Sequence, residues 1–228
     1  MGVAVVSYRL RPTGQSDDIL PQIAFPPLEH LMTAPTPANT RQRILDAAIR
    51  VFARKGYHET RMDDIVAEAH VSKGGVYFHF PGKERLFLAI IDQFAGLLEK
   101  RLTEAIAAER GGVRRVTAAL EAGLDTFAEY RPLAKIFLVQ AVGLGERFER
   151  KRLEINDRFA SLIRTYLEQA VAEGDIPPLD AEVTAYAWVG AIYELVTRWL
   201  LTGKPAPDRW LPSLRLMLLR SIGLEEET

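Results

Sequence analysis

The sequence predicts an all-α protein in which a short three-helix unit precedes a larger helical body. After residue 39, apolar residues recur at helical spacing in one stretch after another, and Gly and Pro residues separate these stretches. The strict apolar–polar alternation of a half-buried strand does not compete with this pattern. The chain has 228 residues, of which 48% are hydrophobic and 26% charged. That balance is typical of a folded protein rather than a disordered or fibrous one.

Residues 1–39 are expected to form an extended or disordered arm, because they carry six prolines and no sustained apolar period. The apolar stretch at residues 3–6 is too short for a signal peptide and no basic residue precedes it. Elsewhere no uncharged run approaches the roughly 18 to 20 residues that span a bilayer. We therefore expect a cytoplasmic protein with no membrane segment.

Three helices are expected between residues 40 and 86. The first begins after Asn39 or Thr40 as N-cap and stops at Gly56. The second follows the capping-box-like start Thr60-Arg-Met-Asp63 and ends near His70. Ser72 can cap the third, which Pro81-Gly82 terminates. Two short helices on so tight a connection, with a longer one in front, predict a helix-turn-helix unit.

The remaining helices should form one larger domain, which gives the division 1–39 (arm), 40–86 (three-helix unit) and 87–228 (body). Gly111-Gly112, Pro132 and later Gly and Pro residues mark the expected helix ends. The expected helices span residues 83–111, 113–130, 132–142, 146–173, 180–202 and 208–222.

The charge distribution is more informative than the net charge of −1, which alone argues against a polyanionic partner. Residues 40–86 hold nine Lys or Arg against six acids, a balance of +3. Residues 1–39 sum to −1, so that the body sums to −3. A basic block inside an otherwise acidic chain favours a nucleic-acid contact by that block alone.

Several function classes are excluded by what the sequence lacks. The chain has no cysteine, and its four histidines all lie in the first 80 residues at spacings that make no metal-ligand motif. Phosphate-binding loops, dinucleotide fingerprints and nucleophile elbows are also missing from the sequence. We therefore expect neither an enzyme nor a bound metal or cofactor.

The segment around the third helix carries the residue types of a DNA-reading helix. A helix-turn-helix presents the N-terminal end of its second helix to base edges, while nearby side chains hold phosphates. Ser72 and Lys73 open the helix, and the small Gly74 and Gly75 would let the backbone approach DNA closely. Further donors for phosphate oxygens follow at Tyr77, His79 and Lys83.

Residues 40–87 resemble the N-terminal DNA-binding domain of the TetR family of transcriptional regulators. The resemblance rests on Ile44-Leu-Asp-Ala-Ala48, on Val71-Ser-Lys-Gly-Gly-Val-Tyr-Phe-His-Phe80 and on Lys83-Glu84 with Leu86-Phe87. It implies that Thr60 binds phosphate and that Arg61 beside it reaches the backbone or a base. The resulting set of DNA-contacting residues is Arg41, Thr60, Arg61, Ser72, Lys73, Gly74, Gly75, Tyr77, His79 and Lys83. Gly75 departs from the family, in which a base-reading side chain often stands there.

The resemblance further implies that the body binds a small-molecule effector and dimerises. Candidate pocket residues are the aromatics of the body and one polar side chain, namely Phe127, Phe137, Gln140, Tyr166, Trp188 and Tyr193. These side chains can equally be ordinary core. If they form a pocket, its effector should be largely apolar or aromatic.

Two apolar stretches near the C-terminus, residues 183–201 and 210–219, either pack within one chain or join a second copy in a four-helix bundle. The resemblance favours the homodimer. The sequence thus predicts a repressor that binds a palindromic DNA operator and is released by a small effector. Two alternatives stay open: an activator or ligand-insensitive regulator, and a helical small-molecule-binding protein that has lost DNA binding.

Overall fold

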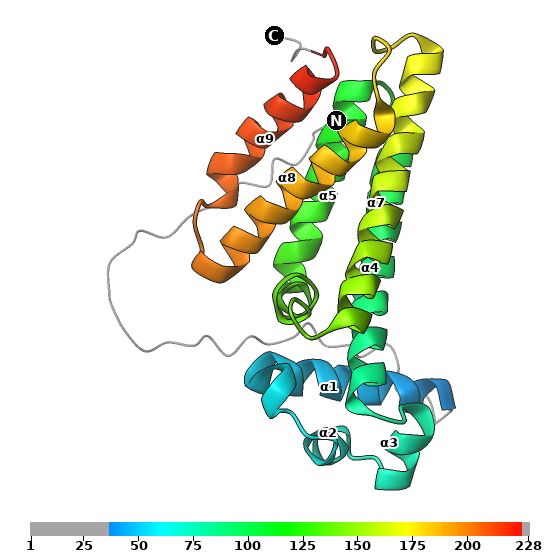
Figure 1. Cartoon of the computed structure of the whole chain (residues 1–228), viewed down its shortest axis with the longest axis vertical. Helices are drawn as coiled ribbons and strands as arrows, with labels where there is room; N and C mark the ends of the chain where they lie inside the picture. The colour runs from blue at the N-terminus through cyan, green and yellow to red at the C-terminus, as the bar shows by residue number, and fades with distance from the viewer. Residues whose placement is uncertain (1–36, 225–228) are drawn as a thin grey trace, which may run out of the picture. The chain divides into compact units, whose positions relative to one another are not determined.

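The computed structural model describes residues 37–224, and side chains from Thr40 onward, so that nearly all of the expected arm lies outside the described residues. The described part of the chain is helical and contains no strand (Figure 1). Its elements are α1 (Pro37–Glu59), α2 (Met62–Ala69), α3 (Lys73–His79), α4 (Lys83–Ala107), α5 (Gly112–Glu129), α6 (Arg131–Lys135), the π-helix η2 (Ile136–Gln140), α7 (Glu146–Glu173), α8 (Ala181–Thr202) and α9 (Pro207–Ser221). The all-α class expected from the sequence is confirmed.

The helices begin and end close to the expected residues. Helix α1 starts at Pro37, two residues before the expected N-cap, at a position where a proline costs no hydrogen bond. Gly56 lies inside the span of α1 but has φ 76° and ψ 172°, so the helix is kinked at the expected stop. The single helix expected over residues 132–142 is divided, because η2 follows α6 directly.

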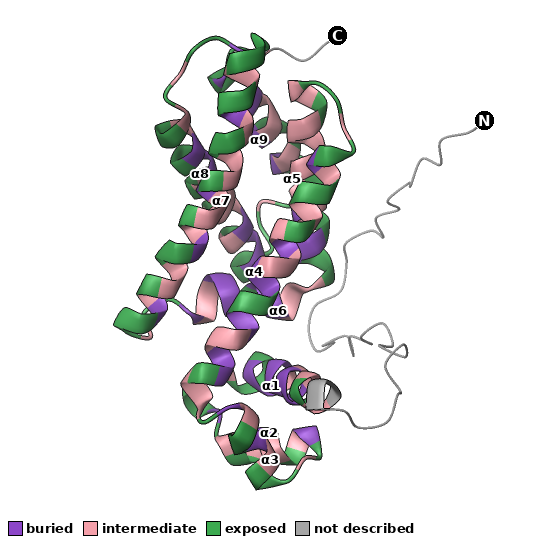
Figure 2. Cartoon of the chain, turned by 90° about the vertical axis from the view of Figure 1, so that its right-hand side faces the viewer, coloured by how far each residue is buried: buried purple, intermediate pink, exposed green. Residues whose placement is uncertain are grey.

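One hydrophobic cluster connects the three-helix unit with the body. The ring of Phe87 on α4 packs edge-on against Phe52 of α1, with centroids 5.0 Å apart, and against Phe148 of α7, at 5.7 Å. All three rings are buried. Figure 2 shows buried residues continuing from α1 through α4 into the body. Because α4 begins at Lys83, the expected domain boundary after residue 86 falls inside a continuous helix.

Part of the apolar repeat of α8 and of α9 is buried within this chain. Trp188 and Val196 on α8 and Leu214 and Leu218 on α9 are all less than 10% exposed. A second set of large apolar side chains on the same two helices remains exposed, namely Val183, Tyr186, Leu201 and Met217. Across residues 37–224, no helix combines the length and the apolar character that crossing a membrane requires.

Candidate nucleic-acid interface and ligand cavity

Ser72 caps the N-terminus of helix α3, and the two glycines of this helix differ in the space around them. The hydroxyl oxygen of Ser72 accepts a hydrogen bond from the Gly75 amide at 3.1 Å. A Cβ atom on Gly75 would lie 2.9 Å from Val71 Cγ1 and 3.1 Å from Ser72 Oγ, whereas one on Gly74 would meet nothing within 4 Å. A side chain at Gly75 would therefore require Val71 to shift, whereas Gly74 leaves the outer surface of the helix open.

The exposed side of α3 carries Lys73 and Tyr77, with His79 half-buried at its end. Lys73 Nζ lies 2.8 Å from Asp63 Oδ1 at the start of α2, and both side chains are exposed. The hydrogen bond to Asp63, reinforced by its charge, raises the pKa of Lys73. The ion pair holds the Lys73 ammonium group of α3 beside the first turn of α2.

The expected capping box at the start of α2 is displaced by one residue. The N-cap is Arg61, whose backbone amide donates to Asp64 Oδ2 at 2.9 Å. Thr60 cannot serve as the cap because it is 1% exposed and its hydroxyl donates to the Gly56 carbonyl at 2.7 Å. The Thr60 hydroxyl thus closes the α1–α2 connection, while Arg61 is exposed.

Lys83 links the start of α4 to the end of α1 by hydrogen bonds. Its ammonium group donates to the carbonyl oxygens of Tyr57 at 2.7 Å and His58 at 3.2 Å, and lies 4.5 Å from the centre of the Tyr57 ring. A lysine in the first turn of a helix faces the unfavourable end of the helix dipole, so that a second partner is expected. The sequence shows that Lys83 opens a helix, but it does not identify the Tyr57 and His58 carbonyls as the partners of its ammonium group.

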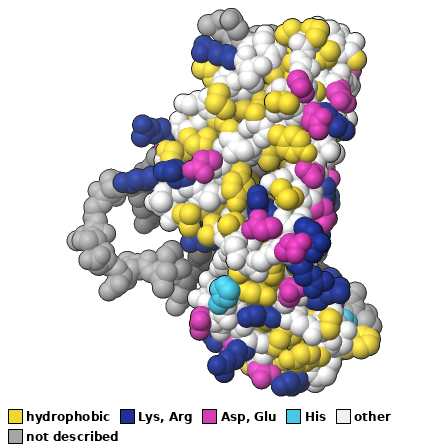
Figure 3. Space-filling model, viewed as in Figure 1, with side chains coloured by type: hydrophobic (Ala, Val, Ile, Leu, Met, Phe, Trp, Pro, Cys, Tyr) yellow, Lys and Arg dark blue, Asp and Glu magenta, His cyan; other side chains and the backbone are white. Residues whose placement is uncertain are grey.

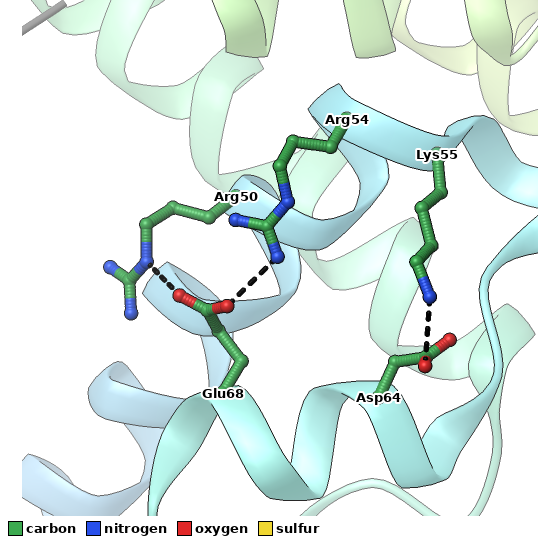
Figure 4. A network of polar contacts seen from close by, with 5 residues as sticks. All are labelled: Arg50, Arg54, Lys55, Asp64 and Glu68. Atoms are coloured by element: carbon green, nitrogen blue, oxygen red, sulfur yellow. Dashed lines mark hydrogen bonds and ion pairs between the residues drawn. The ribbon is translucent and has the colours of Figure 1, made fainter. Parts of the chain in front are cut away.

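Much of the basic block is paired inside the three-helix unit. Arg50 and Arg54 of α1 bind the two carboxylate oxygens of Glu68 at 2.7 and 2.9 Å, and Lys55 binds Asp64 at 2.9 Å (Figure 4). The hydrogen bonds from Arg50 and then Arg54 hold the pKa of Glu68 below its ordinary value. These cations join α1 to α2 by ion pairs that the sequence pattern does not predict.

Two other arginines of α1 lie against neighbouring elements. Arg43 donates to the carbonyls of Ala69 and His70 at 3.1 and 3.2 Å, and so caps the C-terminal end of α2. The guanidinium of Arg41 lies 5.1 Å from the centre of the Phe80 ring, beyond the end of α3. Arg41 is exposed at this position.

The body encloses an apolar cavity of about 130 Å³ between α4, α5, η2, α7, α8 and α9. Phe127, Phe137 and Tyr193, three of the expected pocket residues, line it. Its other walls are almost entirely aliphatic or aromatic, and Asn156 is a polar lining residue that sequence reasoning missed. A cavity of this size holds roughly one benzene ring.

The other three expected pocket residues lie elsewhere. Tyr166 and Trp188 line a separate cavity of about 80 Å³, and the Trp188 indole donates to the Ser221 hydroxyl at 3.0 Å. Gln140 lines neither space. Its amide Nε2 donates to the Phe52 carbonyl of α1 at 3.4 Å, and its Oε1 is buried with no partner among the described residues.

The π-helix η2 contacts both the cavity and the three-helix unit. Phe137 and Leu138 form part of the cavity wall, and the Tyr193 hydroxyl donates to the Leu138 carbonyl at 2.9 Å. At the end of the same element, Gln140 contacts α1 through the Phe52 carbonyl. Short π-helices are often found at functional sites. A change in the cavity wall therefore has a direct physical route to α1.

Comparison with known proteins gives consistent matches. Residues 44–90 match the family model described as bacterial regulatory proteins, tetR family. The HTH-type transcriptional regulator SrpR of Pseudomonas putida is 29% identical over 187 residues, 82% of this chain and 85% of that protein. The uncharacterized HTH-type transcriptional regulator TtgW of the same species is 31% identical over 132 residues, 58% of this chain and 97% of that protein.

A solved structure shares the same fold over most of the chain. The transcriptional regulator FadR from Bacillus subtilis, in complex with stearoyl-CoA, superposes with a TM-score of 0.70 at 22% identity. The match covers 81% of this chain and 99% of that one.

The helix-turn-helix unit and these relatives place the chain in the class of DNA-binding transcriptional regulators, not enzymes. Within that class, the chain belongs to the tetR family of bacterial regulatory proteins.

Proposed function

We propose that this regulator is a homodimeric repressor that binds a palindromic operator and leaves it when a small, largely apolar or aromatic molecule enters the body. The observation that carries the proposal is the position of η2. This five-residue π-helix forms part of the wall of the apolar cavity and also donates a hydrogen bond to α1 of the three-helix unit. A ligand that favours a different arrangement of η2 thereby changes the stability of the DNA-bound state.

The DNA-contacting residues proposed from the sequence divide into two groups. Lys73, Gly74 and Tyr77 on the open side of α3, with Arg61 and Arg41 beside it, are exposed and available to bases or phosphates. Base discrimination is assigned to Arg61, Ser72 and Lys73 and to DNA shape. The second group, Thr60, Gly75 and Lys83, makes its contacts within the protein: Thr60 closes the α1–α2 connection, Gly75 packs in α3, and Lys83 joins α4 to α1. In this group only Lys83 keeps a further N–H donor for a phosphate oxygen, because the Thr60 hydroxyl and the Gly75 amide already donate within the protein. Ser72 belongs to both groups, since it is exposed and also caps α3, and His79 is half-buried at the end of α3.

The effector class follows from the cavity lining. Since the walls offer almost only apolar surface, with Asn156, Tyr193 and Trp210 as the side chains that carry polar atoms, they favour a ring or a short alkyl segment. The B. subtilis relative, whose solved complex holds stearoyl-CoA, supports an apolar chain as one form of such a ligand. Residues 87–228 are proposed as the ligand-binding and dimerisation domain, and residues 40–86 as the DNA-binding domain.

A second copy of the chain is proposed to cover the exposed apolar side chains of α8 and α9. Val183 and Leu201, at opposite ends of α8, are 64% and 59% exposed, and Met217 on α9 is 50% exposed. Two DNA-reading units related by a two-fold axis would match the half-sites of a palindrome. Such a regulator acts in the bacterial cytoplasm, where the DNA is.

The test is selection of an operator from random DNA, followed by the same binding assay with a series of apolar ligands. A palindromic consensus and ligand-dependent release are expected. Equal affinity for random competitor DNA at moderate salt would refute the proposal. Reporter expression in a strain lacking the protein separates the alternatives, since expression rises on loss of a repressor and falls on loss of an activator.

A further inference from the structure

A basic pocket lies beside the apolar cavity, at the turn between α8 and α9. It is an open depression of about 510 Å³, lined by the cations Arg198, Lys204 and Arg209 together with Thr202, Pro205, Trp210 and Ser213. The pocket is separate from the residues that the proposed function uses for DNA. Its cations belong to the body, whose overall charge is negative.

The charges of this pocket are only partly neutralised by the protein. Arg198 lies 3.2 Å from Glu194, one turn earlier on α8. Lys204 and Arg209 are exposed and form no ion pair with a carboxylate of the described residues. Between residues 194 and 215 the chain has four cationic side chains against two acidic ones, Glu194 and Asp208. An anion entering the pocket would therefore meet two cations for which no carboxylate within residues 37–224 competes.

Trp210 is common to the basic pocket and the apolar cavity. The buried indole lines both spaces, and its Nε1 is buried with no acceptor among the described residues. The helical register of α9 explains the arrangement, because Arg209 and Ser213 lie on one face and Trp210 and Leu214 on the next. Arg209 and Ser213 line the basic pocket, and Leu214 lines the cavity. Consecutive residues of α9 thus present charge to one space and apolar surface to the other.

We infer that the effector is amphipathic, with an apolar part in the cavity and an anionic group, a carboxylate or a phosphate, bound by Lys204 and Arg209 at the α8–α9 turn. The inference rests on the proposed function and narrows its ligand class. Arg198 adds charge, and the Trp210 indole supplies a donor at the boundary of the two spaces. The cavity alone would not distinguish an acid from the corresponding alcohol.

The experiment compares octanoate, octyl phosphate and octan-1-ol by calorimetric titration of the full-length protein. The two anions are expected to bind about tenfold more tightly than the alcohol, since each exposed cation contributes roughly a threefold factor. The double substitution Lys204→Gln with Arg209→Gln should remove this advantage, leaving octan-1-ol affinity and operator affinity unchanged. Arg220→Gln, which removes an exposed cation at the far end of α9, serves as the matched control.

The possible outcomes separate the anion site from the apolar cavity. If the anions and the alcohol bind equally to the wild type, or if Arg220→Gln reduces anion binding as much as the double substitution does, the anion site is refuted while the apolar cavity stands. If none of the three ligands binds, the effector class of the proposed function fails and the anion site falls with it. Among outcomes that support the site, preference for octyl phosphate over octanoate, or the reverse, identifies which anion the pocket fits.

Discussion

Replacing Lys83 with methionine separates a structural role of this residue from the phosphate contact that its position in the sequence suggests. Methionine keeps an unbranched side chain over Tyr57 but removes the charge. The structure assigns the ammonium two hydrogen bonds to carbonyls, at 2.7 and 3.2 Å, and a position 4.5 Å from the Tyr57 ring centre. Because the side chain is half-buried, these contacts should together be worth about 2 kcal/mol.

For a chain of this length, a loss of about 2 kcal/mol lowers the melting temperature by roughly 4–8 °C. Differential scanning calorimetry measures that shift, and Arg85→Met, at an exposed position on the same helix turn, is the control. Operator affinity is measured in parallel across salt concentrations. An unchanged melting temperature together with a salt slope lowered by about one would refute the structural role and restore Lys83 as a simple phosphate contact.

The remaining predictions concern α3, the cavity, the α1–α2 ion pairs and the dimer. Gly74→Ala should stabilise the protein by up to about 1 kcal/mol in urea unfolding but weaken operator binding. Gly75→Ala should not give this stabilisation, because its added Cβ would press against Val71 and Ser72. Equal stabilisation by both substitutions would contradict this packing. Ala119→Phe should fill the cavity, abolishing thermal-shift responses to apolar ligands while operator affinity persists; undiminished responses would place the ligand elsewhere. Because Arg50 and Arg54 lower the pKa of Glu68, the stabilisation by its ion pairs is fully present above the ordinary value of 4.5 and is lost as pH falls through the lowered pKa. Urea unfolding of Glu68→Gln should therefore depend less on pH below about pH 5 than unfolding of the wild type, and an equal pH dependence would contradict the role of these pairs. Met217→Asp should dissociate the dimer in analytical ultracentrifugation, and a monomeric wild type would rule the dimer out.

The sequence predicted the helices and the helix-turn-helix unit because these depend on local periodicity and on residues such as Ser72 and Gly56 that end or cap helices. It placed the α2 cap one residue too early, since the burial of Thr60 and its bond to the Gly56 carbonyl are tertiary facts. A count of cations likewise could not show that Arg50, Arg54 and Lys55 are paired with α2 rather than open to DNA.

The cavity was predicted only in part, for a comparable reason. Aromatic side chains of a helical body look alike in sequence whether they line a space or fill the core. Phe127, Phe137 and Tyr193 share one cavity, while Tyr166 and Trp188 line another. The sequence predicts Gln140 as a polar pocket residue, but its side chain contacts α1 across a separation of 88 residues in the sequence. Figure 3 shows hydrophobic and charged side chains interspersed over the visible face, so that surface composition alone does not indicate the cavity.

The most direct test of the account is the reciprocity between effector and operator. A ligand that binds the cavity is titrated into the free protein and into the protein saturated with its selected operator, and the operator affinity is measured with and without that ligand. Coupling through η2 predicts that both affinities fall by the same factor, of about tenfold or more for a useful switch. Equal ligand affinity for free and operator-bound protein would show that the cavity does not control DNA binding.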